Sequence, residues 1–173
     1  MEPKVRLYKP LLSDLWYRKQ LLGDPETMSY NRGYELGFAG YHNETGCIDF
    51  PESDWESWYN WFCKSEPERY YAYIVRCSDG AFLGEVNLHR NASGGWYDMG
   101  IVLDAAHRGK GYSTEALRLL LAEAFDRLGA SEVRNDFELE RSAALKAHLA
   151  AGFRVIGEED GIVRVGITKE EFE

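Results

Sequence analysis

The spacing of hydrophobic and polar positions changes along the chain and predicts its first elements. Residues 15–22 and 53–64 carry apolar side chains at helical spacing. Ser53, with Glu56 three residues later, has the pattern of a capping box, so the second helix is expected to begin there. Residues 24–50 hold glycines and tyrosines without a clear period, which predicts loops, with room for one helix, near the mouth of a site.

Short apolar segments joined by turn-forming residues come next. They are residues 70–77, 81–90 and 96–103, and an earlier segment at residues 5–8 has the same character. Connections as short as SDG and NASGG are typical of antiparallel neighbours. We therefore expect a meander of three antiparallel strands, preceded along the chain by one short strand.

The second half of the chain alternates between helical and strand patterns. Helical spacing covers residues 113–128 and 141–151, a strand pattern covers 132–139, and a closing hairpin is expected from 153–157 and 162–168. The strands on either side of the first of these helices should run parallel, because such a crossover is almost always right-handed within one sheet. The whole pattern predicts an α+β fold, with a mixed, mostly antiparallel twisted sheet and helices on both faces.

The composition narrows the classes of function. Hydrophobic residues make up 45% and charged residues 28% of the chain, which is typical of a globular protein. The formal net charge of −9 repels a phosphate backbone, so no nucleic-acid partner is expected. No apolar run is long enough to span a membrane, and MEPKVRLYKP lacks the character of a signal peptide. A cytoplasmic protein without a membrane partner is therefore expected.

The cysteines and histidines point to neither a disulfide framework nor a metal site. Cys47, Cys63 and Cys77 form no CxxC pair, and the four histidines show no paired spacing. We expect no bound metal and three free thiols.

One segment has the composition of an anion-binding turn. Residues 104–117 read DAAHRGKGYSTEAL, between a predicted strand and a predicted helix. Gly109 and Gly111 allow a sharp turn and a close approach of the backbone to a ligand. The first amides of the helix lack internal partners, and Arg108 and Lys110 add positive charge. Such a turn suits a pyrophosphate group.

Three interpretations of this turn compete. The simplest is that its glycines only end a strand. A nicotinamide-binding motif is the second, but GxGxxG would require glycine where Thr114 stands, and no strand–helix unit precedes the turn. The GxxxxGK[ST] pattern of a phosphate-binding loop is absent. The third interpretation is a family resemblance.

The turn resembles the signature of the GNAT superfamily of N-acetyltransferases. Its run Arg108-Gly-Lys-Gly111-Tyr-Ser113 matches [QR]-x-x-G-x-[GA] except that Ser113 replaces glycine or alanine. The order of elements is also similar, and Gly152-Phe153 supplies the helix ending that is usual in the family. The resemblance covers about residues 70–153. The run RGKGYSTEAL looks like the ribosomal-protein-type branch, which also acetylates other amines.

The resemblance implies an enzyme that moves an acetyl group from acetyl-CoA directly to a primary amine of a small molecule or a protein N-terminus. It also divides the single domain of residues 1–173. Residues 1–69 would form a helical and loop region on the acceptor side, residues 70–157 the acetyl-CoA-binding core, and residues 158–173 the last strand of the C-terminal hairpin.

The same resemblance assigns the cofactor site. Amides of the signature turn would hold the pyrophosphate, and the strand before the turn, bulged at Gly100, would pair with the pantetheine arm. The strand at 132–139 would splay away to leave a slot. The implied cofactor-binding residues are Ile101, Val102, Leu103, Arg108, Gly109, Lys110, Gly111, Tyr112, Ser113, Thr114 and Asn135.

The catalytic groups are less sharply defined. In the family a tyrosine protonates the leaving thiolate, and here His148 stands at that position; it either donates the proton or packs among alanines. A carboxylate should accept the proton of the amine. Glu138 is the first choice because its strand borders the slot, and Asp136 shares its face. Glu85 and Asp98, in the meander, remain open.

The acceptor itself is not specified. Trp55, Trp58 and Trp61 could form a cage for a cation, but their helical spacing favours packing on the sheet. Three tyrosines of the loop region are candidates by position alone: Tyr30, Tyr34 and Tyr41. Relatives in the family are often homodimers. Two alternatives remain: an acyl-CoA-binding module without catalysis, and a nicotinamide-dependent oxidoreductase.

Overall fold

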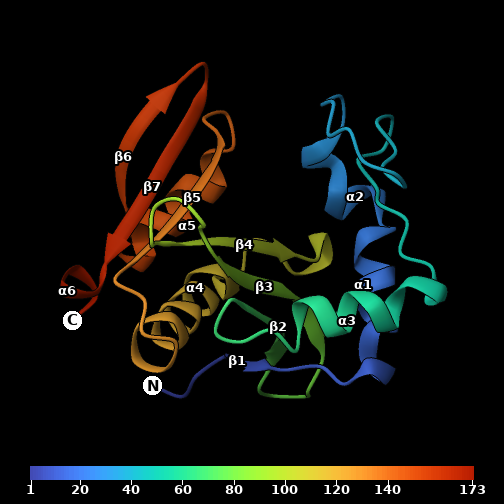
Figure 1. Cartoon of the computed structure of the whole chain (residues 1–173), viewed down its shortest axis with the longest axis horizontal. Coiled ribbons are helices and arrows are strands. Elements are labelled where there is room, and N and C mark those ends of the chain that lie inside the picture. The colour runs from blue at the N-terminus through green and yellow to red at the C-terminus, as the bar shows by residue number, and fades with distance from the viewer.

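The sheet has seven strands and confirms the predicted α+β class. The computed structural model describes all 173 residues. Its strands lie in the order β1-β2-β3-β4-β5-β7-β6 (Figure 1). They are β1 (Val5–Tyr8), β2 (Arg69–Arg76), β3 (Phe82–Arg90), β4 (Tyr97–Leu103), β5 (Glu132–Glu138), β6 (Arg154–Glu159) and β7 (Ile162–Thr168). Every predicted strand is present, with ends that differ by one or two residues.

The strands run in the predicted directions, but the position of the last strand in the sheet was not predicted. β4 and β5 are parallel and all other neighbours are antiparallel. The last strand, β7, lies between β5 and β6 and pairs with β5 along its whole length. Hydrophobic periodicity carries no information on which strand of a hairpin joins the sheet, so the sequence left this order open.

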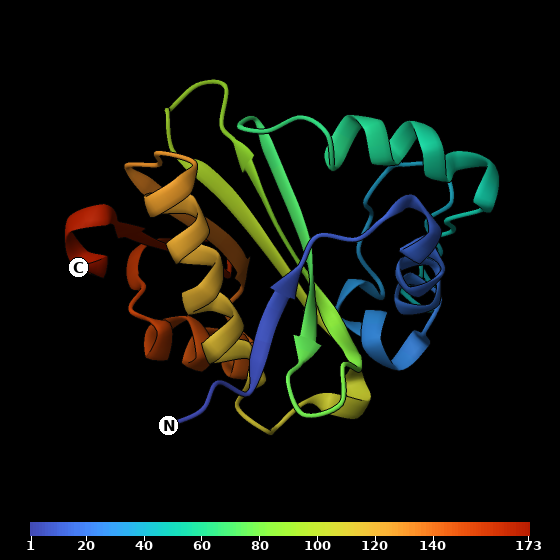
Figure 2. The same ribbon diagram turned by 90° about the horizontal axis from the view of Figure 1, so that it is seen from below.

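Helices cover both faces of the sheet. They are α1 (Leu15–Leu22), α2 (Pro25–Met28), α3 (Trp55–Phe62), α4 (Tyr112–Ala122), α5 (Ser142–Ala151) and α6 (Lys169–Phe172). Seen from below, α4 and α5 lie on one side of the strands and α1 to α3 on the other (Figure 2). None of the helices combines the length and the apolar character needed to cross a lipid bilayer.

Two helix boundaries differ from the sequence prediction. Ser53 does not begin α3, because a short 3₁₀ turn at Glu52–Asp54 comes first and Asp54 is the N-cap residue, without a side-chain capping bond. The predicted helix 113–128 is α4 continued by one π-helical turn, Glu123–Arg127. These changes follow from local backbone geometry that side-chain spacing does not record.

The predicted C-terminal strand is followed by a helix that the sequence analysis missed. Thr168 accepts a hydrogen bond from the amide of Glu171 at 3.2 Å, and the Glu171 carboxylate accepts one from the amide of Thr168 at 3.0 Å. This capping box begins α6. Phe172 then packs against Phe125 after α4, with ring centroids 5.4 Å apart. The T-x-x-E pattern was the available signal.

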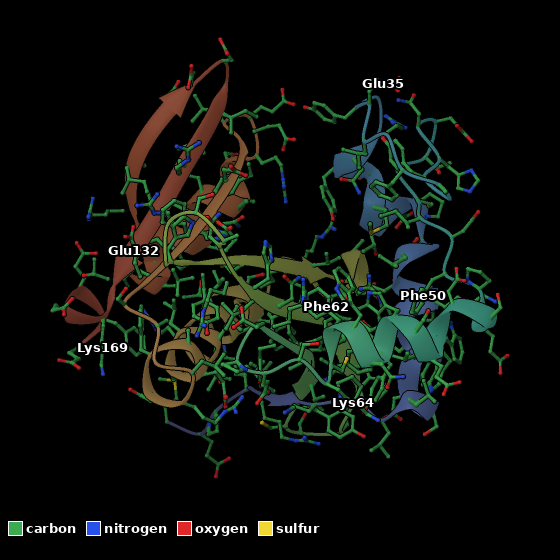
Figure 3. All side chains as sticks on the ribbon, in the orientation of Figure 1. Glu35, Phe50, Phe62, Lys64, Glu132 and Lys169 are labelled. Carbon is green, nitrogen blue, oxygen red and sulfur yellow. The ribbon has the colours of Figure 1, made fainter.

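The two faces of the sheet have different cores. The α4 side is mainly aliphatic, with Leu117, Leu120 and Val133 fully buried. The α1 side is aromatic, and Tyr17, Tyr71 and Tyr73 are buried there. In Figure 3, Phe50 and Phe62 lie in this N-terminal half, whereas Glu132 lies at the base of the C-terminal strands. The strand β4 joins the two halves.

A buried ion pair fastens α1 to the middle of the sheet. Arg18 Nη1 lies 2.6 Å from Glu85 Oε2, and the Tyr71 hydroxyl donates to the same carboxylate. The guanidinium also lies 4.2 Å from the ring centroid of Trp58. Burial, together with the Glu85 carboxylate, raises the pKa of Tyr71 well above its ordinary value, so its hydroxyl remains a donor. The buried Glu85 carboxylate is therefore stabilised by both the Arg18 cation and the Tyr71 hydroxyl, and the loss of either would leave it without one of its partners.

Removing the cation of this cluster should destabilise the fold. Arg18→Met is expected to lower the free energy of unfolding by about 3–5 kcal/mol in urea titrations, because Glu85 would stay buried without its partner. Gln20→Ala, at an exposed position of the same helix, should change it by less than about 0.5 kcal/mol. Adding Glu85→Gln to Arg18→Met should recover part of the loss, since no charge is then buried. Equal stability of Arg18→Met and Gln20→Ala would contradict this account.

Candidate functional site

The strands β4 and β5 part after a short contact. Residue pairs between them are limited to Tyr97 with Val133 and Asp98 with Arg134. Beyond Asp98, the strand β4 continues to Leu103 and pairs only with β3. Its N–H and C=O groups on the β5 side are therefore available to a ligand, as the splayed-strand prediction requires. Figure 1 shows the two strands diverging toward the loop that precedes α4.

The predicted bulge at Gly100 is wrong. Gly100 pairs regularly with Asn87 of β3, within an unbroken register from Gly84 to Arg90. The glycine is required for another reason: a Cβ added to Gly100 would lie 2.7 Å from Asn87 Nδ2. The missing side chain thus lets the Asn87 amide lie over β4 at the start of the slot. Sequence reasoning did not single out Asn87, because only the register between the strands brings it there.

The signature turn leads directly into α4. Gly111 is the N-cap residue at φ +82°, and no side chain caps the helix. The amides of Tyr112, Ser113 and Thr114 are therefore among those without intrahelical partners. Gly109, at φ +78°, has an equally restricted conformation. This turn and the β5-facing edge of β4 at residues 101–103 form the two walls of the candidate cofactor site.

The Arg108 side chain, expected to add positive charge for an anion, instead bonds to backbone carbonyl oxygens. Its guanidinium donates to the carbonyl oxygen of Leu103 at 3.2 Å and to that of Thr27 at 2.8 Å. The side chain thereby ties the turn to the end of β4 and to α2, and only its backbone remains as a candidate contact for an anion. Lys110 is exposed and is free to supply positive charge.

A second lysine near the turn was not predicted. Lys4 Nζ lies 3.7 Å from the position that a Cβ on Gly111 would take. The segment is held there by Glu115 of α4, whose carboxylate accepts bonds from the amides of Lys4 and Val5 at 2.8 and 3.2 Å. More than a hundred residues separate Lys4 from the turn in sequence, so no local pattern signals this proximity.

His148 lies inside the protein beside the slot. Its side chain is 2% exposed and packs between the rings of Phe137 and Phe153. Nδ1 lies 2.7 Å from the carbonyl oxygen of Ala144, and Nε2 lies 3.1 Å from Asn135 Nδ2. Burial lowers the pKa of His148, so the neutral ring is favoured, with the proton on Nδ1. Both ring nitrogens are thus engaged within the protein.

Two of the four carboxylates named from the sequence are fully engaged. Glu85 belongs to the buried cluster around Arg18. Asp98 accepts bonds from Asn91 Nδ2 at 2.9 Å and from Trp96 Nε1 at 3.0 Å. Their oxygens hold the local structure, which leaves them poorly suited to receive a proton from a substrate.

The other two carboxylates lie on the open face of β5. Glu138 lies 3.7 Å from Arg141 Nη1 and is partly buried. Asp136 is exposed, and its carboxylate makes no hydrogen bond or salt bridge within the protein. Asp136 lines a polar basin of about 470 Å³ that also includes Asp98 and Met99 of β4. This basin opens on the face of the sheet opposite α4, at the narrow end of the slot.

The aromatic residues of the N-terminal half have several roles. Trp58 packs edge-on against Tyr71, with centroids 4.9 Å apart, whereas Trp61 is 54% exposed and lies 4.4 Å from the guanidinium of Arg69. Trp55 and Trp58 both contact Phe50, with ring centroids 6.1 and 5.4 Å from that of Phe50. Trp58 and Trp61 do line a shallow cavity of about 420 Å³ with Phe38 and Phe50.

Tyr30 and Tyr34, from the N-terminal loop region, contact residues at the start of α5 across the wide end of the slot. Arg141, at the start of α5, lies 4.5 Å from the ring centroid of Tyr30. The Tyr34 hydroxyl donates to Glu140 Oε1 at 3.1 Å. Tyr41, by contrast, bonds to the backbone of its own loop at Asn31 and Tyr34. No group of three or more His, Cys, Asp or Glu side chains is arranged to hold a metal ion.

Comparison with known families gives one match. Residues 5–154 match the family model described as an acetyltransferase (GNAT) domain. No protein with a curated description matches the sequence significantly.

Solved structures with the same fold include several acetyltransferases. A spermidine N-acetyltransferase from Vibrio cholerae in complex with CoA and spermine superposes with a TM-score of 0.75, at 17% identity over 99% of each chain. An acetyltransferase (GNAT family) from Bacillus anthracis gives 0.72, at 15% identity over 96% of each chain. An aminoglycoside acetyltransferase in complex with coenzyme A and kanamycin gives 0.68, at 15% identity over 98% of this chain and 96% of the other. At these identities the likeness is one of fold.

The turn before α4 can be tested by a single substitution. Gly111→Val forces a β-branched residue into φ +82°, so we expect it to displace the first amides of α4 and to abolish binding of CoA in calorimetric titrations. Gly129→Val is the matched control, since Gly129 has φ +74° near the other end of the same helix. It should cost similar stability and leave CoA binding intact. CoA binding by folded Gly111→Val with wild-type affinity would contradict the anion-site assignment.

Proposed function

This chain belongs to the GNAT acetyltransferase family, and we propose that it transfers the acetyl group of acetyl-CoA directly to a primary amine. The observation that carries the proposal is an uncapped helix N-terminus at Gly111 together with a β4 strand that has no partner on its β5 side beyond Asp98. The first suits a pyrophosphate and the second suits the amide-containing arm attached to it.

The proposed cofactor contacts come from backbone more than from side chains. Amides of residues 108–114 would bind the pyrophosphate, with Lys110 and Lys4 adding positive charge. Backbone groups of Ile101, Val102 and Leu103 on the β5 side, which have no partner strand there, would hydrogen-bond to the pantetheine arm in the manner of an added strand. Asn135 borders the same slot from β5. These contacts would leave the acetyl group where the strands diverge.

The acceptor amine would approach through the polar basin, on the face of the sheet opposite α4. This amine must be neutral to attack, so a carboxylate of β5 accepts its proton while the new N–C bond forms and the C–S bond breaks. Glu138 and Asp136 are the two candidates. Asp136 has no partner within the protein and lines the basin, whereas the Glu138 carboxylate lies 3.7 Å from Arg141 Nη1 and is not among the groups that line the basin.

The leaving thiolate does not require a strong acid from the protein. An unperturbed thiol has a pKa of about 8.5, so the thiolate can depart near neutral pH and take its proton from water. His148 stands where the family resemblance expects the acid. Its position in α5 beside the slot supports that role, but the Nδ1 proton is directed to the Ala144 carbonyl oxygen. We therefore propose that His148 acts mainly by position.

The acceptor is proposed only as a class. Small polyamines and amino sugars belong in a test panel, because a spermidine N-acetyltransferase and an aminoglycoside acetyltransferase share this fold. A peptide with a free N-terminus completes the panel. The free thiols of Cys47, Cys63 and Cys77 suit a reducing compartment, and we propose that the enzyme acts in the cytoplasm.

Direct binding measurements separate this function from its alternatives. We expect calorimetry to show binding of acetyl-CoA and none of NADH, and acetyl-CoA with an accepting amine to release free thiol. Binding of acetyl-CoA without turnover on any amine of the panel would favour a non-catalytic acyl-CoA-binding module. Binding of NADH alone would favour an oxidoreductase. No binding of either by the folded protein would refute the proposal.

The proton acceptor can be identified with two isosteric substitutions. Asp136→Asn is expected to lower kcat by about 10²-fold to 10⁴-fold, the usual contribution of a general base, with little change in acetyl-CoA affinity. Glu138→Gln serves as the matched comparison and should lower kcat less. The reverse order would make Glu138 the base, and wild-type turnover in both variants would exclude the carboxylates of β5.

A further inference from the structure

The point at which the slot opens coincides with one side-chain hydrogen bond. Asn135 follows directly after Arg134, the last residue of β5 that pairs with β4. Its Oδ1 accepts a hydrogen bond from the amide of Asp136 at 2.9 Å. Side chains of asparagine compete in this way with the strand ladder, because they satisfy a backbone donor locally. With its amide satisfied by Asn135, Asp136 has less need of a carbonyl partner on β4.

A buried histidine fixes the orientation of that asparagine. The Nδ1–H of His148 donates to the Ala144 carbonyl oxygen at 2.7 Å, which leaves Nε2 as an acceptor. Asn135 Nδ2, 3.1 Å away, is then the donor, and its Oδ1 is turned toward the amide of Asp136. The chain of bonds from α5 to β5 is consistent in every donor and acceptor.

The packing around His148 makes this chain rigid. The imidazole is 2% exposed, and its centroid lies 5.0 Å from that of Phe137 and 5.1 Å from that of Phe153. Such a side chain has little freedom to change rotamer. The His148 ring therefore fixes the position of Asn135, at the point where β5 leaves β4, relative to α5.

We propose that Asn135 and His148 are positioning residues that end the pairing of β4 with β5 and hold the slot open for the acyl arm of acetyl-CoA. The inference rests on the proposed function, since it assigns a role within that same slot. It replaces proton donation by His148 with a fixed hydrogen-bond acceptor, and it makes the Asn135 amide the group that sets the depth of the slot.

Three variants separate positioning from proton donation. Asn135→Leu removes both bonds of the asparagine, and His148→Phe removes its acceptor. His148→Gln can place an amide oxygen near the former Nε2 and so accept from Asn135, but it cannot act as an acid near neutral pH. Lys146→Ala, at an exposed position of α5, is the control for changes in that helix.

We expect Asn135→Leu and His148→Phe each to raise the acetyl-CoA dissociation constant about tenfold, the effect of a buried polar group that loses its partner. Turnover at saturating acetyl-CoA should stay within about threefold, as expected when a bond serves binding equally in both states. His148→Gln should restore the affinity and keep the pH profile of kcat. If His148→Gln loses turnover as severely as His148→Phe, with affinity unchanged, His148 is an acid and the inference fails.

A measurement without ligand tests the inference even if the chain binds no acetyl-CoA. Hydrogen exchange followed by NMR should show the exchange rate of the Asp136 amide changed at least tenfold in Asn135→Leu: faster where the amide is left without an acceptor, and slower where β5 pairs further with β4. His148→Phe should show a change in the same direction, and Lys146→Ala none. Unchanged exchange of Asp136 in both site variants would overturn the proposal independently of the enzymatic function.

Discussion

The parting of β4 from β5 is the feature on which the rest of the molecule depends. Only two residue pairs join these strands. These pairs, which we call the seam, are the only β-pairing between the four N-terminal strands and the three C-terminal strands. A longer seam would close the slot, and a shorter one would leave the halves connected mainly through α4 and α5. The aliphatic core under α4 spans both halves, with Leu88 of β3 and Val165 of β7 in one cluster. That shared core allows the seam to be short.

Of the charged side chains near the contact between β4 and β5, some are bonded within the protein and one is left free to meet a substrate. Glu85 and Asp98 have every oxygen occupied by neighbouring groups, and their strands are correspondingly well anchored. Asp136 has no such partner and lies where the basin meets the slot. Arg108, a residue of the signature, belongs to the structural group, since its guanidinium is spent on two backbone carbonyl oxygens. Sequence shows only which residue types are present and not which of them remain free.

Much of the fold could be predicted because it is written in local periodicity. The meander, the crossover and the two long C-terminal helices follow from apolar spacing and from glycines such as Gly111 and Gly152. The insertion of β7 beside β5 and the approach of Lys4 to the turn could not be predicted, since both depend on contacts between distant segments. The role of Gly100 was misread because a glycine that makes room for Asn87 looks the same in sequence as one that bends a strand.

The placement of β7 has a consequence for where this domain can be cut. The residues that match the family model end at 154, just as β6 begins. A fragment with those limits would lack β7, which pairs with β5 from Glu132 to Glu138 and also carries β6. The edge of β5 would then be bare along its whole length, and exposed strand edges of this kind promote aggregation. The stretch defined by similarity is therefore smaller than the unit that can fold, and a fragment made for expression must extend through Thr168.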